Sequence, residues 1–155
     1  MKPIDYYSNE IISKYNPKTT LEHRENIVIE SIHQLKLEDD ASIIDVGCGD
    51  GYFLSRLNQA MSGHINYYGV DYSADQISVA REKHSFNFNT CNLEEGIPFP
   101  DKIFNVLYAG EVIEHLYNPD LFLAEVFRVL KKNGYFLLST PNLNSWINRL
   151  LCLFG

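Results

Sequence analysis

Three glycines alternate with other residues at positions 47, 49 and 51, directly after an apolar run that contains Asp45. Glycines at such spacing allow a sharp turn, and they let a ligand touch the backbone. A helix that follows such a loop offers free backbone N–H groups and the positive end of its dipole. The spacing therefore predicts a loop that holds a polar ligand.

Asp71 stands at the end of the next apolar run along the chain. A carboxylate at this place in a nucleotide-binding sheet can accept hydrogen bonds from both hydroxyls of a ribose. The glycines and Asp71 together predict a ligand that contains a ribose. A dinucleotide site would share these features, but its loop has the pattern G-x-G-x-x-G. Tyr52 stands where the third of those glycines would be, which disfavours an NAD-dependent oxidoreductase.

A short segment with the pattern E-x-x-E-H, formed by Glu111, Glu114 and His115, follows a later apolar run. His115 is the candidate catalytic base, because imidazole titrates near neutral pH; packing at the start of a connection is its alternative role. Three O and N ligands on so short a segment would need further ligands to complete a metal shell. We therefore expect no metal there.

The elements that must position these residues alternate between short apolar runs and amphipathic segments. Alternating strands and helices indicate crossover units, and hence a parallel sheet with helices on both faces. In such a sheet the ligand binds outside the carboxyl ends of the strands, near the point where strand order reverses. We expect strands at 42–46, 66–70, 86–91, 104–109 and 135–140, and helices at 19–38, 51–61, 73–83, 118–132 and 142–155.

Helix ends carry recognisable capping patterns. Thr19 with Glu22, and Ser73 with Gln76, have capping-box spacing. The pair Asn118-Pro119 is typical of a helix start. We expect Gly134 to end that same helix as a left-handed cap.

Composition narrows the class of protein. The chain has 155 residues, 45% of them hydrophobic, which suits one globular domain. Twenty acidic residues against 13 basic ones give a net charge of −7 and argue against a nucleic-acid partner. We expect neither a membrane-spanning helix nor a signal peptide, because no apolar run is long enough to span a membrane and the first 20 residues lack an apolar core. Three scattered cysteines predict a reduced, cytoplasmic protein.

From about residue 41 to residue 142 the sequence resembles the class I S-adenosylmethionine-dependent methyltransferases. Several motifs of that family occur here in order, and their order makes the resemblance specific. The resemblance implies a Rossmann-like, doubly wound, mainly parallel sheet. It also implies S-adenosyl-L-methionine as cofactor and S-adenosyl-L-homocysteine as product. The matching segments are 43–51, 68–73, 91–99, 104–116 and 128–134.

The resemblance also implies which part of the cofactor each candidate residue contacts. Asp45 and the glycine loop would hold the methionine portion, Asp71 the ribose hydroxyls, and Tyr72 one face of the adenine. Asn92 and Leu93 would approach the adenine edge. Gly110 and Glu111 would line the far wall of the pocket. The full set is Asp45, Gly47, Cys48, Gly49, Gly51, Asp71, Tyr72, Asn92, Leu93, Gly110 and Glu111.

The sequence departs from the family pattern in a few places. The adenine-edge residue is commonly Asp and is Asn92 here, whose amide oxygen can still accept a hydrogen bond. Cys48 has no base paired with it in the sequence, so we expect a small buried spacer and not a nucleophile. Some methyltransferases of the ubiquinone pathway bind a divalent ion at a cluster similar to E-x-x-E-H. We expect Glu111 to line the cofactor pocket and Glu114 to form a salt bridge instead.

The common family fold has seven strands, and its last two form an antiparallel hairpin. This sequence predicts five strands, so we expect the hairpin to be missing from a truncated or unusually short member. We expect one domain over 1–155, with an N-terminal lid and helix at 1–40, a cofactor-binding core at 41–141 and an amphipathic tail at 142–155. The lid candidates, which could also belong to a simply packed terminus, are Tyr6, Tyr7, Tyr15 and His23.

The predicted function is transfer of a methyl group to an O, N or C atom of a small metabolite or a lipid or sugar precursor. The alternative is a non-catalytic module that binds S-adenosylmethionine or a partner on the same fold. A small-molecule acceptor is the expected partner, and both a monomer and a homodimer remain open.

Overall fold

The computed structural model describes residues 21–140. By compactness the chain divides into two units, Met1–Ile27 with Asn142–Gly155, and Val28–Pro141. Of the first unit, only the start of one helix is described. The predicted tail helix, the capping residue Thr19 and the tyrosines of the expected lid lie outside the described residues. His23 is described and is exposed on that helix.

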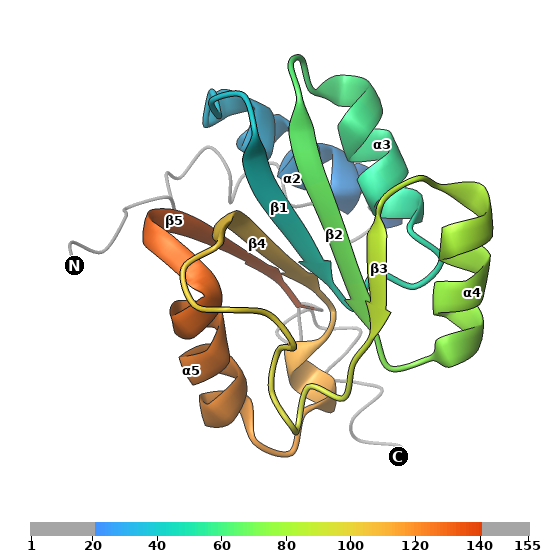
Figure 1. Cartoon of the computed structure of the whole chain (residues 1–155), viewed down its shortest axis with the longest axis vertical. Coiled ribbons are helices and arrows are strands. Elements are labelled where there is room, and N and C mark those ends of the chain that lie inside the picture. Colours follow the sequence, from blue (N-terminus) through green and yellow to red (C-terminus); the bar gives the residue numbers. More distant parts are fainter. Residues whose placement is uncertain (1–20, 141–155) are drawn as a thin grey trace, which may run out of the picture. The chain divides into compact units, whose positions relative to one another are not determined.

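Five parallel strands form one sheet in the order β3-β2-β1-β4-β5 (Figure 1). Strand order reverses between β1 and β4, which is where ligands bind in sheets of this kind. The predicted α/β class and parallel, doubly wound sheet are confirmed. The elements are α2 (Leu21–Gln34), β1 (Ala41–Val46), α3 (Tyr52–Ala60), β2 (Ile65–Asp71), α4 (Ala74–Lys83), β3 (Asn87–Thr90), β4 (Phe104–Gly110), the 3-10 helix η1 (Ile113–His115), α5 (Pro119–Val129) and β5 (Leu130–Ser139).

Each face of the sheet in the unit Val28–Pro141 has its own apolar core. Ile43 of β1 packs on one face with residues of α3, α4 and the later part of α2. Its neighbour Ile44 packs on the other face with residues of α5. Successive side chains of a strand point to opposite faces, so a central strand buried on both sides reads as a continuous apolar run. This explains why β1 could be recognised in the sequence.

Two of the predicted helix starts are confirmed by their hydrogen bonds. The Ser73 hydroxyl accepts from the Gln76 N–H at 3.3 Å at the start of α4. The Asn118 amide oxygen accepts from the Leu121 N–H at 3.1 Å at the start of α5. Each cap satisfies a backbone donor that the first turn of a helix leaves without a partner.

The predicted end of α5 is wrong. The helix stops at Val129, and Leu130 already pairs with Phe104 as the first residue of β5. The pairing of β4 with β5 shifts register between Phe104 and Val106, which leaves extra residues between Leu130 and Tyr135. The residue among them with a left-handed backbone is Asn133 (φ 65°), not Gly134. The pairing of Leu130 with Phe104 ends the helix before Lys131 and Lys132. Asn tolerates a left-handed backbone better than most residues do.

Helix α2 also ends earlier than the expected Asp39-Asp40 pair. It stops at Gln34, and Lys36 takes a left-handed conformation (φ 49°). The Leu35 N–H then donates to Ile32 O and the Lys36 N–H to His33 O, so tight turns close the helix. Within residues 21–140 we find no helix long and apolar enough to cross a bilayer.

Candidate cofactor site

The glycine loop leaves β1 at the point where strand order reverses. The N–H groups of Gly47 and Cys48 both donate to Val70 O of β2, at 2.8 and 3.0 Å. Gly49 and Gly51 have φ values of 52° and 79°, a region that side chains disfavour. A Cβ on Gly51 would lie 2.7 Å from Phe88 Cζ, whereas a Cβ on Gly49 would meet nothing within 4 Å. Gly51 therefore serves close packing, and Gly49 presents bare backbone to open space.

Asp71 lies beside that open position, at the carboxyl end of β2. Its Oδ2 accepts from the Gly49 N–H at 2.9 Å, and its Oδ1 accepts from the Ser73 N–H at 2.8 Å. An ionised carboxylate has about four acceptor positions. These two bonds thus leave capacity for the two hydroxyls of a ribose. The carboxylate, fixed by two backbone amides next to an open glycine, fits a ribose-containing cofactor.

Gly110 is the last residue of β4, and Glu111 follows it, on the other side of the reversal. Glu111 has a left-handed backbone (φ 55°), and its N–H donates to Ser139 O at 2.8 Å. A non-glycine residue in this region costs on the order of 1–3 kcal/mol and is common at functional sites. A Cβ on Gly110 would collide with the hydroxyl of Tyr108, which lies 3.1 Å from Ser139 Oγ. The carboxyl ends of β4 and β5 are therefore tied together at the expected far wall of the pocket.

Asp45 and Cys48 are buried near the start of the glycine loop. Asp45 is paired in register with Gly69 of β2 and Tyr108 of β4. Burial, and then the charges of Asp45 and Asp71, raise the pKa of the Cys48 thiol well above its usual value of 9.0. A neutral, buried thiol is a poor nucleophile. These surroundings suit a spacer, as the sequence predicts.

The candidates for the adenine differ in how freely they could contact it. The Tyr72 side chain is 78% exposed. Leu93 packs partly buried against the core. The Asn92 amide is used within its own turn: its Nδ2 donates to Glu95 Oε1 at 2.8 Å, and its Oδ1 accepts from the Glu94 N–H at 3.2 Å. Of these three, Tyr72 is the most open to a ligand.

His115 lies in η1, and its side chain is exposed, as is that of Glu114. Both follow Glu111, the expected far wall of the pocket, within four residues along the chain. Across residues 21–140, no three or more His, Cys, Asp or Glu side chains are grouped so that they could hold a metal ion. The absence of a resident metal stays a prediction.

Contacts among the loops after β3 and β4 were not anticipated from the sequence. Glu94 Oε1 accepts from the Tyr117 N–H at 2.7 Å, which joins the two loops. Arg128 and Glu125 of α5 hold the loop after β3 through several hydrogen bonds. For the contacts of Arg128 and Glu125, the only signal in the sequence was that these two residues carry opposite charges three positions apart on a predicted helix. That spacing indicates an ion pair but not its contact with a distant loop.

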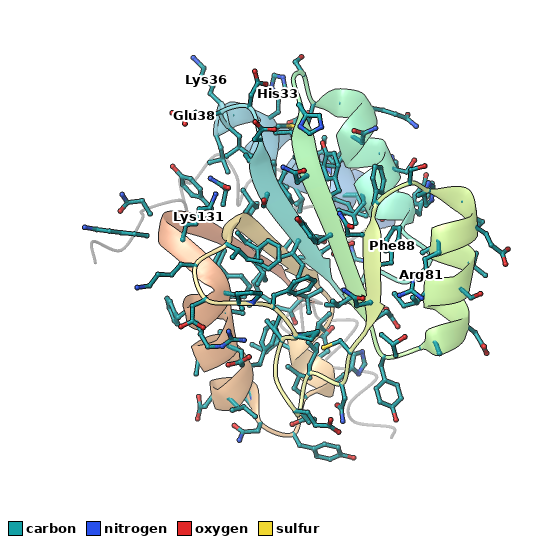
Figure 2. All side chains as sticks on the ribbon, in the orientation of Figure 1. His33, Lys36, Glu38, Arg81, Phe88 and Lys131 are labelled. Carbon is teal, nitrogen blue, oxygen red and sulfur yellow. The ribbon has the colours of Figure 1, made fainter. Side chains whose placement is uncertain are left out.

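Charged side chains elsewhere hold the rest of the sheet edge and the loop. Arg81 of α4 donates to Phe88 O of β3 from Nε at 3.1 Å, and Figure 2 shows the two residues side by side. Lys83 pairs with Asp50 of the glycine loop, at 2.7 Å between Nζ and Oδ2. The hydrogen bond from Lys83 lowers the pKa of Asp50 below its usual 3.8. Helix α4 thus supports both β3 and the glycine loop.

The fold and this site define a Rossmann-like protein that binds a ribose-containing cofactor. Residues 37–153 match the family model described as a methyltransferase domain. A Mycolicibacterium smegmatis protein named "Probable S-adenosylmethionine-dependent methyltransferase" is 35% identical over 101 residues, covering 64% of this chain and 38% of its own length. The mitochondrial ubiquinone biosynthesis O-methyltransferase of Mus musculus is 29% identical over 129 residues, covering 77% of this chain and 34% of its own length.

Among solved structures, the DszA carbon methyltransferase superposes with a TM-score of 0.67 at 24% identity, covering 82% of this chain and 37% of the other. This likeness shows the fold. The chain belongs to the class I S-adenosylmethionine-dependent methyltransferases, a family of enzymes. It spans about a third of the length of the curated relatives it matches.

Proposed function

We propose that this protein transfers a methyl group from S-adenosylmethionine to an O, N or C atom of a small metabolite or a lipid or sugar precursor. The observation that carries the proposal is Asp71, held by the Gly49 and Ser73 amides beside the open face of Gly49. Family membership supports the cofactor, and the O-methyltransferase name of the mouse relative supports an oxygen acceptor.

The residues of this chain would act mainly by alignment. When bound, the cofactor supplies a methyl group on a sulfonium, which is already a good leaving group. Asp71 would hold the ribose through its two free acceptor positions, while the glycine loop and Asp45 would hold the methionine end. Fixing donor and acceptor in an attack geometry can account for roughly 7–11 kcal/mol of a barrier.

His115 is the proposed base for an oxygen or nitrogen acceptor. Its side chain is exposed on η1, directly after the pocket wall, where an acceptor molecule could reach it. It would take the acceptor's proton onto a ring nitrogen as the new bond forms. General base catalysis of this kind is worth about 10²–10⁴ in rate. A carbon acceptor with an acidic proton would use the same group.

Calorimetric titration with S-adenosylhomocysteine tests the cofactor site. We expect micromolar affinity, about −8 kcal/mol, for the unchanged protein. Asp71→Ala should abolish measurable binding, because it removes the ribose acceptor and releases the two backbone amides. Glu82→Ala, an exposed change on α4, serves as the control and should bind normally. Binding of NAD in place of S-adenosylhomocysteine would contradict the proposal.

Transfer of a labelled methyl group tests the reaction itself. The acceptors to screen are phenols and catechols, fatty acids, amines and sugar derivatives, each incubated with labelled S-adenosylmethionine. His115→Gln should lower kcat by about 10²-fold or more with an O or N acceptor and leave the affinity for S-adenosylhomocysteine unchanged. Tight cofactor binding without transfer to any acceptor would favour the non-catalytic alternative.

A further inference from the structure

The segment between β3 and β4 has no regular structure, although it carries two of the candidate adenine residues, Asn92 and Leu93. Segments of this kind are usually mobile unless other groups hold them. A binding segment that is already ordered costs less free energy to bind a ligand than one that must be ordered on binding. What holds this segment therefore bears on cofactor affinity.

Arg128 of α5 makes hydrogen bonds to the later part of the segment, residues 97–101. Its Nη1 donates to Phe99 O and to Asp101 Oδ1, both at 2.8 Å, and its Nη2 donates to Ile97 O at 2.8 Å. A planar guanidinium can make these bonds at fixed angles, which an ammonium cannot do. One side chain thus fixes two backbone carbonyls and the end of the segment.

Glu125, one turn earlier, holds Arg128 and the segment at once. Its Oε1 accepts from Arg128 Nε at 2.7 Å, and its Oε2 accepts from Arg128 Nη2 at 2.6 Å. Oε2 also accepts from the Ile97 N–H at 2.8 Å. Gly96 comes so close that a Cβ there would lie 2.9 Å from Oε2. The carboxylate is therefore packed against the backbone of the segment.

The backbone of residues 96–99, which Glu125 and Arg128 hold, continues directly into the turn that carries Asn92 and Leu93. The Gly96 N–H donates to Leu93 O at 3.4 Å, and the Glu95 N–H donates to Asn92 O at 3.0 Å. The Cys91 thiol lies 3.3 Å from Gly96 O. A movement of residues 96–99 would therefore displace the turn.

We propose that Glu125 and Arg128 are positioning residues for the adenine end of the cofactor: they hold the segment 96–101 on α5 and thereby fix the turn that presents Asn92 and Leu93. The inference rests on the proposed function, since it assigns the adenine to that turn. Neither side chain contacts the cofactor in this assignment.

The test compares two variants of the pair with a neighbour on the same helix. Arg128→Ala removes the three hydrogen bonds of the guanidinium to the segment and leaves the bond from the Ile97 N–H to Glu125. Glu125→Gln weakens the pair but leaves an amide oxygen for the Ile97 N–H. Val126→Ala is the matched control, because Val126 is fully buried on α5 and its truncation loosens the apolar core while leaving the hydrogen bonds of Glu125 and Arg128 to the segment in place. Each variant is checked by circular dichroism and thermal unfolding.

Two titrations report on the adenine end. Affinity is measured for S-adenosylhomocysteine and for S-inosylhomocysteine, which lacks the adenine amino group. We expect Arg128→Ala to bind S-adenosylhomocysteine about tenfold more weakly and to discriminate less between the two ligands. Glu125→Gln should show a smaller loss in the same direction. Val126→Ala should have a lower Tm but keep both its affinity and its discrimination. Hydrogen exchange over residues 91–99 should quicken in Arg128→Ala but not in Val126→Ala.

Equal losses of affinity in Arg128→Ala and Val126→Ala, with discrimination unchanged in both, would mean that the pair only stabilises the fold and would overturn the inference. Should Arg128→Ala fail to fold, unchanged discrimination in Glu125→Gln would overturn it as well. A lack of S-adenosylhomocysteine binding by the unchanged protein would instead refute the proposed function. The two failures are therefore distinguishable.

Discussion

Single residues in the glycine loop have different tasks even though they share one conformation. Gly49 and Gly51 both have positive φ, but only Gly51 is closely surrounded, by Phe88 and His84. An added side chain at either position would strain the backbone, and at Gly51 it would also collide. Stability and binding should therefore respond differently to changes at the two positions.

Gly49→Ala should lower the free energy of unfolding by about 1–2 kcal/mol, the cost of a left-handed alanine. It should also weaken S-adenosylhomocysteine binding strongly, because the new methyl group enters the open space beside Asp71. Gly51→Ala should lose more stability than Gly49→Ala, because it also meets Phe88. Urea unfolding and calorimetry measure the two effects. Unchanged ligand affinity in Gly49→Ala would show that the cofactor does not approach this backbone.

Helix α5 illustrates how an element is positioned from both ends. Asn118 caps its start, and pairing of Leu130 with Phe104 ends it. Between them the helix buries Phe122, Val126 and Val129 against the sheet. The partly buried pair of Glu125 and Arg128 on this helix can hold the segment after β3 only when the helix is in this place.

Asn118→Ala should lower the free energy of unfolding by about 1 kcal/mol, since the Leu121 N–H loses its acceptor. Asn118→Gly, measured beside it by urea unfolding, should cost only a few tenths of a kcal/mol, since glycine still permits water to reach the helix end. Loss of equal size in both variants would indicate that the Asn118 side chain matters through other contacts.

The pair Glu125–Arg128 should make stability depend on acidic pH. The hydrogen bonds from Arg128 lower the pKa of Glu125 to about 2 from its usual 4.5. The unfolded chain thus binds a proton at this site at a higher pH than the folded protein does. The contribution is present above pH 4.5 and is lost as the pH falls from 4.5 toward 2. Urea midpoints measured over this range should fall less steeply for Glu125→Gln; an equal slope would contradict the assignment.

At the scale of the whole sheet, buried ionisable groups have the opposite effect at alkaline pH. Burial raises the pKa of Cys91 from 9.0 to about 11 and that of Tyr67 from 10.0 to about 12, and the pKa of Cys48 also rises. The folded protein keeps these protons where the unfolded chain has released them. Stability should therefore fall as the pH rises above about 9.

The measurement is a series of urea unfolding curves between pH 8 and pH 10.5. Cys91→Ser should reduce the slope of stability against pH, although it lowers stability at every pH. Cys91 and Cys48 should also react slowly with iodoacetamide at pH 8 until urea unfolds the chain. Rapid alkylation of the folded protein at either position would contradict the burial that raises these pKa values.

Local patterns in the sequence accounted for most of the fold and for the core of the site. The strands could be recognised because a sheet covered on both faces has apolar strands, as in β1 with Ile43 and Ile44. Alternating helices and strands then left a parallel sheet as the consistent arrangement, and its carboxyl edge located the glycine loop and Asp71. Helix starts at Ser73 and Asn118 were predictable because a cap bonds to an amide three residues away.

What the sequence could not indicate depended on residues distant in the chain. The end of α5 was misplaced because pairing of Leu130 with Phe104 outweighs a local glycine signal. The close approach of Phe88 to Gly51, the contact of Glu94 with Tyr117 and the grip of Arg128 on residues 97–101 all join segments far apart in sequence. The sequence by itself determined the class of fold, which follows from periodicity, and the family, which follows from motifs in a fixed order. It also located Asp71, the carboxylate proposed to bind the ribose, by its place at a strand end. Only the tertiary structure decided which loops are held and by what, because those hydrogen bonds form only after the sheet has brought its strand ends together.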